Sequence, residues 1–457
     1  MSINPAGGQW MGLGRLLWRT RRGRRANDPG AVLRALARGA DKGVGIRIRD
    51  RHILLLTDPT LAGDLLASHA SDTVKGPGIQ LTRGLLGNGL LTSEGADHKR
   101  ARRLVAPAFS PRRLAGYTDT FASCAQDHTA AWLDGDQLDM HREMATLTLQ
   151  IVGRTLLGID LTAEAPQVRA GLESALEEFG GNAFALPSGP GGMSRRVIGR
   201  QLGSAPPMPT GDDSARLAVH ELVDRIIEQR RATATDDRGD VVSALLAASL
   251  EPDGLTPTEV HDHVITLLMA GHETTANALS WTLLLLSRHP DIQKKLHAEV
   301  DELGRLPTFD DIPRLPYTRA VISEGIRLYP PAWIMGRSTT IDLTIGGWQL
   351  PAGSVVATSP LLLHHDARWF SSPESFDPDR WLDERRDAVP RNAYLPFGTG
   401  PRACIGEQFA WTETIAVLAV LARSWSFRSD PTLEVTPQYR VTLRPDGGLP
   451  MTVHVRP

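Results

Sequence analysis

A long segment that is apolar around nearly its whole circumference most constrains how this chain can fold. Residues 256–288 begin with Thr256-Pro257-Thr258-Glu259, a capping box with proline at the first helical position. They end at His289-Pro290. A helix that is apolar on most of its faces is buried through the middle of a large protein. We therefore expect this helix to lie at the centre of the fold.

Shorter patterns predict more helices and a small amount of β-structure. Residues 43–58 alternate as a β-hairpin does, and strand-like segments with a glycine turn lie over 339–358. Helices are expected over 317–328 and 404–422. Residues 180–212, rich in Gly and Pro, are either a domain linker or a long loop that acts as a lid. We favour the lid, because no second core pattern follows.

The composition favours a protein that binds no nucleic acid and works inside the cell. Fifty basic residues are balanced by 52 acidic ones, with a formal net charge of −2, so no basic excess points to nucleic acid. The two cysteines, Cys124 and Cys404, do not make a disulfide framework in so long a chain, which favours a cytoplasmic location. Cys124 lies in no motif, and we expect it to be buried.

The N-terminal segment carries a few apolar residues followed by a basic run over 19–25. The apolar part is far shorter than the ~20 residues that span a bilayer, and it lacks the cleavage site of a secretory signal. We expect no transmembrane segment. Residues 1–42 are interpreted as a helical lead-in segment packed on the domain; an amphipathic anchor at a membrane surface is the alternative.

Residues 397–406, with the sequence FGTGPRACIG, hold a cysteine in a setting suited to iron. A thiolate binds iron when its charge is stabilised, and a helix N-terminus does this through its dipole and free N–H groups. The glycines let the backbone curl around the sulfur and approach a flat macrocycle. Arg402 can reach a carboxylate on the edge of such a cofactor.

This segment resembles the haem-binding loop of the cytochrome P450 family, Phe-x-x-Gly-x-Arg-x-Cys-x-Gly. The resemblance implies that Cys404 is the axial ligand of haem b (iron protoporphyrin IX) and that Phe397, Arg402 and Gly406 bind the cofactor. It covers residues 43–457 and implies a single catalytic domain of the bacterial soluble type. The fold implied is mainly α with a small β-rich side (α+β), the triangular prism of the family.

The central helix carries Ala270-Gly271-His272-Glu273-Thr274-Thr275, which are locally unfavourable choices. Glycine and threonine loosen a helix, so the cluster indicates a functional opening. The segment is similar to the family's oxygen-binding signature. That similarity implies that Thr274 bonds to the reacting oxygen or its water, that Glu273 feeds protons inward, and that Gly271 makes room for O2. His272 is interpreted as structural.

Another pair of segments resembles the family's scaffold. Glu324 and Arg327 lie at i and i+3 on one helix face among apolar residues. Pro378-Asp379-Arg380-Trp381 resembles the segment whose arginine completes a Glu-Arg-Arg triad. The resemblance therefore implies a buried triad of Glu324, Arg327 and Arg380, with Trp381 where the family usually has Phe.

Haem has two propionates, so basic residues are expected to converge on them. His98 and Arg102 are spaced i and i+4 and resemble the family's (Trp/His)-x-x-x-Arg element. Arg337 resembles the propionate-binding arginine after the Glu-x-x-Arg helix. Arg402 is the fourth residue expected to bind a propionate. The other basic residues near His98 fit a solvated face that docks an acidic redox partner.

The resemblance also implies a substrate pocket lined by Leu268, Ala270, Trp333 and Met335. Large apolar side chains there favour a small lipophilic substrate, such as a terpenoid or another secondary-metabolite intermediate. No flavin or iron–sulfur motif is visible in the sequence. We therefore expect that electrons come from a separate ferredoxin with an NAD(P)H-dependent reductase. We also expect the protein to be a monomer.

The main prediction is a monooxygenase that activates O2 with two externally supplied electrons to hydroxylate or epoxidise its substrate. A haem-thiolate peroxygenase or rearranging enzyme is the first alternative, although such relatives tend to lose the acid–threonine pair that is intact here. A haem-thiolate gas or redox sensor would need an output domain, and none is found in the sequence. A thiol hydrolase using Cys404 with a distant histidine is the last alternative.

Overall fold

The computed structural model describes residues 10–12, 14–16, 18–20, 28–48, 50–166, 168, 170–171, 213–232 and 239–456. The lid predicted over 180–212 lies outside them. The longer helices are α6 (Gly95–Val105), α7 (Pro111–Thr129), α8 (Met140–Val152), α11 (Asp213–Ala232), α13 (Pro257–Arg288), α14 (Pro290–Asp301), α15 (Pro316–Leu328) and α18 (Glu407–Ser424). Shorter helical segments connect them: α2 (Pro29–Ala37), α3 (Pro59–Gly63), η1 (Asp64–Ser68), α4 (Pro77–Leu81), α5 (Arg83–Leu86), η2 (Ala106–Phe109), η3 (Gly153–Leu157), α12 (Val241–Ala248), η4 (Phe309–Arg314), α16 (Pro360–His364), η5 (Pro378–Trp381), α17 (Asp383–Asp387) and η6 (Gly400–Arg402).

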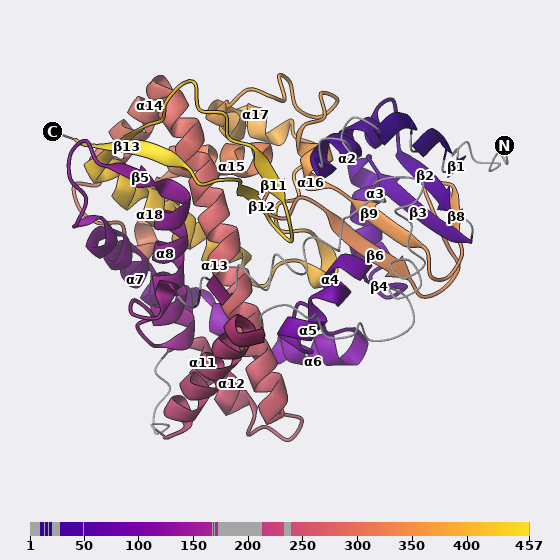
Figure 1. Ribbon diagram of the computed structural model, residues 1–457, viewed down its shortest axis with the longest axis horizontal. Helices are drawn as coiled ribbons and strands as arrows, with labels where there is room; N and C mark the ends of the chain where they lie inside the picture. The colour runs from indigo at the N-terminus through magenta and orange to yellow at the C-terminus, as the bar shows by residue number, and fades with distance from the viewer. Residues whose placement is uncertain are drawn as a thin grey trace.

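Helix α13 runs through the middle of the helical part of the molecule (Figure 1). It begins with the predicted capping box, in which the Thr256 hydroxyl accepts from the Glu259 N–H and the Glu259 carboxylate accepts from the Thr256 N–H. Most of its residues are buried, and it packs against α8, α15 and α18. The predicted central helix is therefore confirmed.

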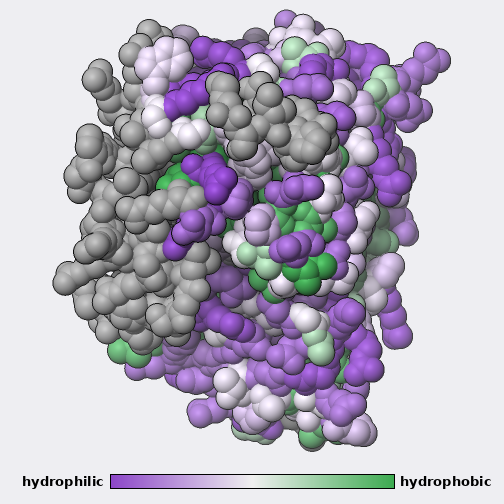
Figure 2. Space-filling view, turned by 90° about the vertical axis from the view of Figure 1, so that its right-hand side faces the viewer, coloured by the Kyte–Doolittle hydropathy of each residue, from purple (hydrophilic) through white to green (hydrophobic). Residues whose placement is uncertain are grey.

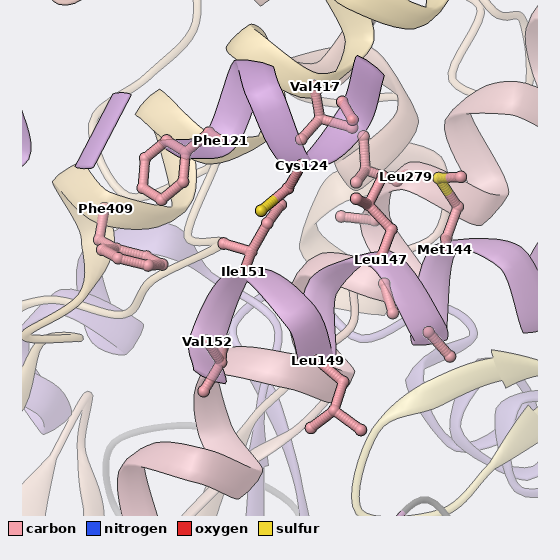
Figure 3. Packing of buried hydrophobic residues seen from close by; sticks show 14 of the residues in the cluster. Phe121, Cys124, Met144, Leu147, Leu149, Ile151, Val152, Leu279, Phe409 and Val417 are labelled. Atoms are coloured by element: carbon pink, nitrogen blue, oxygen red, sulfur yellow. The ribbon is translucent and has the colours of Figure 1, made fainter. Parts of the chain in front are cut away.

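Helices α7, α8, α13 and α18 meet in the largest apolar core (Figure 3). Phe121 and Cys124 of α7 lie against Ile151 of α8 and Phe409 of α18 there, and the rings of Phe121 and Phe409 meet edge to face at 5.0 Å. Cys124 is free and buried, as predicted. It serves as one more apolar side chain of this core.

The six-stranded sheet lies on the right of Figure 1, whereas β13 and β5 lie on the left among the helices and β11 and β12 lie near the middle. Six strands form the main sheet in the order β1-β2-β3-β9-β6-β4, and three smaller sheets contain β10-β13-β5, β11-β12 and β7-β8. Their bounds are β1 (Trp10–Met11), β2 (Gly43–Ile48), β3 (Arg51–Leu56), β4 (Thr73–Lys75), β5 (Gln137–Asp139), β6 (Met335–Thr339), β7 (Leu343–Ile345), β8 (Trp348–Leu350), β9 (Val355–Thr358), β10 (Trp425–Arg428), β11 (Pro437–Tyr439), β12 (Leu443–Pro445) and β13 (Pro450–Val455). The two predicted hairpins are confirmed as β2–β3 and β7–β8.

The described residues of the N-terminal segment belong to this sheet side. Strand β1 pairs in parallel with β2, and the Trp10 ring packs edge-on against Trp348 at 5.2 Å. Gly45 of β2 lies between the two indoles, since a Cβ there would come within 2.4 Å of Trp348 and 2.7 Å of Trp10. Leu16 is buried on this side of the molecule too, in an apolar cluster with Met11 and Ile46. These residues pack on the protein, while Trp18 is exposed.

One predicted boundary is wrong. The last long helix was expected to begin at residue 404, but α18 begins at Glu407. The Cys404 N–H donates instead to the Phe397 carbonyl at 2.9 Å, so the chain is still turning at the cysteine. The prediction of a mainly helical fold with a small β-rich side is confirmed.

The surface over the six-stranded sheet is largely hydrophilic, with a few recessed apolar areas (Figure 2). Among the described residues, no helix combines the length and the apolar character that crossing a membrane requires.

Candidate active site

The loop before Cys404 is tightly folded. Gly398 and Gly400 have φ of +69° and +77°, in the left-handed region that favours glycine. A Cβ at Gly400 would lie 2.6 Å from the Leu66 carbonyl oxygen, so the loop rests directly on η1. The glycines predicted to let the chain curl around the sulfur are therefore needed at two of these positions.

The Cys404 thiol is surrounded by protein and yet accessible. Burial raises its pKa, and the Gly406 N–H, which donates a hydrogen bond to the sulfur, acts in the opposite direction. Cys404 as a whole residue is nevertheless accessible to solvent. Both observations agree if the thiol borders an interior space. Phe397, whose carbonyl accepts from the Cys404 N–H, packs edge-on against Trp411 of α18 at 5.5 Å.

Basic side chains from four segments converge next to this loop. Arg102 of α6 donates to the Ala403 carbonyl at 2.7 Å, and Arg402 lies 2.7 Å from the Glu94 carboxylate. Burial and the neighbouring cations Lys75, Arg402, Arg102 and Arg337 lower the pKa of His98 to about 4. The structure thus brings together the four residues predicted to bind propionates.

Two of these cations have unsatisfied donors. Arg337 Nε and Arg402 Nη1 are buried, and neither has a hydrogen-bond partner among the described residues. Burial lowers the pKa of Arg337 to about 10, with Arg402 adding to the effect. Buried guanidinium N–H groups without acceptors are costly, so a ligand with carboxylates fits this place. Together with the accessible thiol, the residues present fit a haem.

The predicted oxygen-side residues lie where α13 becomes accessible. Ala270 is exposed, whereas residues 264–268 and 275–286 are buried. The Thr274 hydroxyl donates to the Ala270 carbonyl at 2.7 Å, and the Glu273 carboxylate accepts from the Thr442 hydroxyl at 2.7 Å. Helix α13 continues without a break through these residues, and Ala270 is exposed between two buried stretches.

Gly271 has a packing role that the sequence did not indicate. A Cβ at this position would lie 3.2 Å from Val152 Cγ2 and 3.6 Å from Leu156, so the glycine faces α8 and η3. His272 is buried, and its carbonyl accepts from Thr148 of α8 at 3.1 Å. This turn of α13 thus fits closely against α8.

The predicted Glu-Arg-Arg triad is present as a buried network. Arg327 donates to both carboxylate oxygens of Glu324, at 2.8 and 2.9 Å, and Arg380 donates to one of them at 3.4 Å. Arg327 also donates to backbone carbonyls of three residues: His364, Pro373 and Ser375. Trp381 adds an indole N–H to Glu324 at 2.9 Å, which the family's usual Phe cannot supply.

Comparison with known proteins settles the family. Residues 5–449 match the family model described as Cytochrome P450. The chain is a cytochrome P450. It is 40% identical to cyclooctatin synthase of Streptomyces melanosporofaciens over 88% of this chain and 86% of that protein. It is 35% identical to pentalenene oxygenase of Streptomyces avermitilis over 86% of each. The crystal structure of another cytochrome P450 superposes with a TM-score of 0.79 at 25% identity, covering 94% of both chains.

The family fixes the class of chemistry. A third relative, 38% identical over 78% of this chain and 76% of that protein, is the cyclooctat-9-en-7-ol 5-monooxygenase of Streptomyces melanosporofaciens. The predictions of a haem-thiolate P450 fold and of a monooxygenase are confirmed.

The P450 has a buried acid that the sequence analysis missed. Glu413 of α18 is fully buried, and its Oε1 accepts from the Thr275 hydroxyl at 3.3 Å. Its Oε2 has no hydrogen-bond partner among the described residues, and burial raises its pKa well above the ordinary value. The sequence did carry a signal for this residue, because Glu413 is an acidic residue among the apolar positions of α18. Glu413 links α18, which follows the cysteine, to the helix that carries Thr274.

Lys75 and Glu94 were also missed. Lys75 lies opposite Arg337 in the β4–β6 pair, and its ammonium donates to the Leu90 and Ser93 carbonyls. Burial lowers its pKa to about 7. Glu94 accepts from the Lys75 backbone N–H at 2.5 Å. It therefore belongs to the cation cluster, which is the group of basic side chains beside the cysteine loop.

The residues predicted to line the substrate pocket lie in different surroundings. Ala270 is exposed, and Met335 is half-buried beside Gly398, whose Cβ would lie 3.6 Å from the Met335 sulfur. Leu268 is fully buried in the main core. Trp333 is also fully buried, with its indole N–H on the Arg440 carbonyl at 2.9 Å. Of the four, Ala270 and Met335 have the accessibility that a pocket wall needs.

Proposed function

We propose that this P450 oxidises a cyclic terpenoid, using haem b held by Cys404 and protons delivered by Glu273 and Thr274. The names of three relatives support the substrate class. Two of them act, by their names, on cyclooctat-9-en-7-ol and on pentalenene, which are alkenes with one hydroxyl group or none. The apolar walls expected around Ala270 and Met335 suit such a molecule.

Each part of the site then has a distinct task. When bound, the haem supplies the iron at which dioxygen is reduced and split. Cys404 gives up its thiol proton to become the ligand, and the Gly406 N–H stabilises the negative sulfur. Arg337 and Arg402 would hold the propionates with their unsatisfied N–H groups, and His98 and Arg102 would complete that side. Phe397, whose carbonyl accepts from the Cys404 N–H, would help to hold the loop that carries the sulfur.

On the side of the proposed haem site opposite Cys404, Thr274 and Glu273 bind and transfer protons. The Thr274 hydroxyl can exchange its bond to the Ala270 carbonyl for a bond to the reacting oxygen. Glu273 can take up a proton from water and pass it to Thr274.

Electrons come, in this proposal, from a separate ferredoxin with an NAD(P)H-dependent reductase. The exposed cations Lys99 and Arg103 of α6, on the helix that touches the cysteine loop through Arg102, suit an acidic partner. We further propose that the protein is a cytoplasmic monomer.

Ligation is tested with the reduced protein under carbon monoxide. A thiolate ligand gives a strongly red-shifted Soret band, and the band should be lost in Cys404→Ala but kept in Cys124→Ala. A red-shifted band in Cys404→Ala would remove Cys404 from its role.

The substrate class is tested by adding pentalenene, cyclooctat-9-en-7-ol and, for contrast, a straight-chain fatty acid to the oxidised protein. Binding next to the iron displaces its water and shifts the Soret band, and we expect the shift for the cyclic alkenes. A shift with the fatty acid alone would contradict the terpenoid proposal. Turnover that runs on peroxide but not on O2 with a reductant would favour the peroxygenase alternative.

A further inference from the structure

A row of hydrogen-bonded side chains leads across the molecule to Glu273. His141 Nε2 of α8 lies 3.1 Å from Asn277 Oδ1, Asn277 Nδ2 donates to Thr442 Oγ1 at 3.1 Å, and Thr442 donates to Glu273 Oε1 at 2.7 Å. Glu273 and Asn277 are spaced i and i+4 on α13, so their side chains share one face of the helix. Thr442 comes from the turn between β11 and β12, far along the chain.

In each hydrogen bond of this row, the donor is on the His141 side and the acceptor is on the Glu273 side. A threonine hydroxyl has one proton, and because Asn277 donates to Thr442, that proton is left for Glu273. On its other side Asn277 faces His141 with its oxygen, which requires a proton on His141 Nε2. If the amide were reversed, its oxygen would take the Thr442 proton and Glu273 would face a lone pair. With a proton on His141 Nε2, the order of donation runs from His141 to Glu273.

Burial makes this order rigid. Asn277 is fully buried and Thr442 nearly so, and both connect elements that come from separate parts of the chain. Among the described residues, titratable side chains on the elements around Glu273 include His141, Arg142 and Glu143 on α8, His272 on α13, Glu413 on α18, Tyr439 on β11, and Arg440 and Arg444 beside the β11–β12 turn. An amide does not pass protons on, so the row does not conduct protons from His141 to Glu273.

We propose that Thr442 and Asn277 are positioning residues that hold the Glu273 carboxylate ionised and turned toward the β11–β12 turn. This rests on the proposed role of Glu273 in proton delivery. A carboxylate that accepts a hydrogen bond is favoured over its protonated form. Glu273 then starts each cycle as a base that takes a proton from water, and it moves to Thr274 once it carries that proton and the bond from Thr442 is weakened.

The test is a pH titration of Glu273 by infrared difference spectroscopy on the haem-loaded protein. The carboxylate band is identified as the one that Glu273→Gln removes. In Thr442→Val the donor is lost with little change of shape, so the midpoint should rise by about one pH unit. Thr442→Ser keeps the hydroxyl and should return the midpoint to that of the original protein.

An unshifted midpoint in Thr442→Val would overturn the proposal, and so would an equal shift in the Ser variant, which would indicate a packing effect. The role of Glu273 itself is tested separately, by oxygen consumption with pentalenene and a surrogate ferredoxin and reductase. There Glu273→Gln should be at least about tenfold slower, in the range that a positioned acid–base group contributes. A normal rate would remove the proton-delivery role while leaving the infrared result on Thr442 standing.

Discussion

Glu324 and Glu413 are both completely buried glutamates on helices that pack against α13, yet their surroundings are opposite. Glu324 accepts hydrogen bonds from two arginines, from the Trp381 indole and from the Asp377 N–H. Among the described residues, one group donates to Glu413, the Thr275 hydroxyl, at 3.3 Å. Similar burial is thus compensated in two different ways.

The difference shows how a folded chain tolerates a carboxyl group away from water. A buried carboxylate is stable when cations and N–H groups surround it. Without them the group keeps its proton, and burial accordingly raises the pKa of Glu413. Glu324 therefore binds the scaffold together, while burial favours the protonated form of Glu413 next to Thr275.

The largest expected effect is that of Arg327→Ala. Removing this partner leaves Glu324 as an under-compensated buried charge, which costs on the order of 3–5 kcal/mol. We expect protein without haem and a large fall in the urea midpoint of unfolding. Arg386→Ala, at an exposed arginine of α17, is the control and should behave normally. A folded Arg327→Ala variant with full haem content would contradict the comparison.

Trp381→Phe should have the next largest effect. A smaller aromatic ring remains, and one N–H donor to a charged acceptor is lost, which costs about 1.5–3 kcal/mol. Trp281→Phe is the matched control, because its indole N–H donates to a neutral carbonyl, that of Leu443, at 3.2 Å. Equal losses of unfolding free energy in the two variants would mean that the charge on Glu324 adds nothing to the bond.

Glu413→Gln should have a small effect. If the carboxyl group carries a proton in the folded protein, replacing it by a neutral amide of the same size should change the unfolding free energy at pH 5 by less than about 1 kcal/mol. Glu324→Gln under the same conditions is the contrasting variant. The two glutamates would prove alike if both substitutions destabilised equally.

The pH dependence of Glu413→Gln sharpens the same point. In the original protein the folded state keeps a proton on Glu413 above pH 4.5, where the unfolded chain releases it, so this group weakens stability as pH rises. Glutamine does not titrate. Relative to the original protein, the variant should gain about 1.4 kcal/mol per pH unit above pH 5, up to the raised pKa. A difference that does not vary between pH 5 and 8, measured by urea unfolding, would mean that the acid is already ionised.

Much of the fold followed from patterns that neighbouring residues make. The capping box fixed where α13 starts, and alternation located the hairpins β2–β3 and β7–β8. The Glu324–Arg327 pair, too, could be anticipated, because the two residues share a helix face; Arg380 was added to it by the resemblance to the family. Local signals of this kind do not depend on how distant segments meet.

The missing parts of the site depend on contacts between distant segments. Lys75 and Glu94 became part of the cation cluster only through the pairing of β4 with β6 and the approach of Arg402. Trp333 was expected at the pocket, but its indole finds the Arg440 carbonyl 107 positions later. The start of α18 was placed too early because the Cys404 N–H bonds back to Phe397. No sequence spacing indicates these partners.

Strand β1 has a consequence for anyone who shortens this protein. It covers part of the outer edge of β2, and Trp10 closes one side of Gly45. Trimming the chain to the start of α2 would uncover that edge and leave an indole-sized gap beside Trp348. Open strand edges pair with one another, so the trimmed protein would tend to self-associate, and its tendency to precipitate would reflect the missing edge rather than any fault of the catalytic machinery.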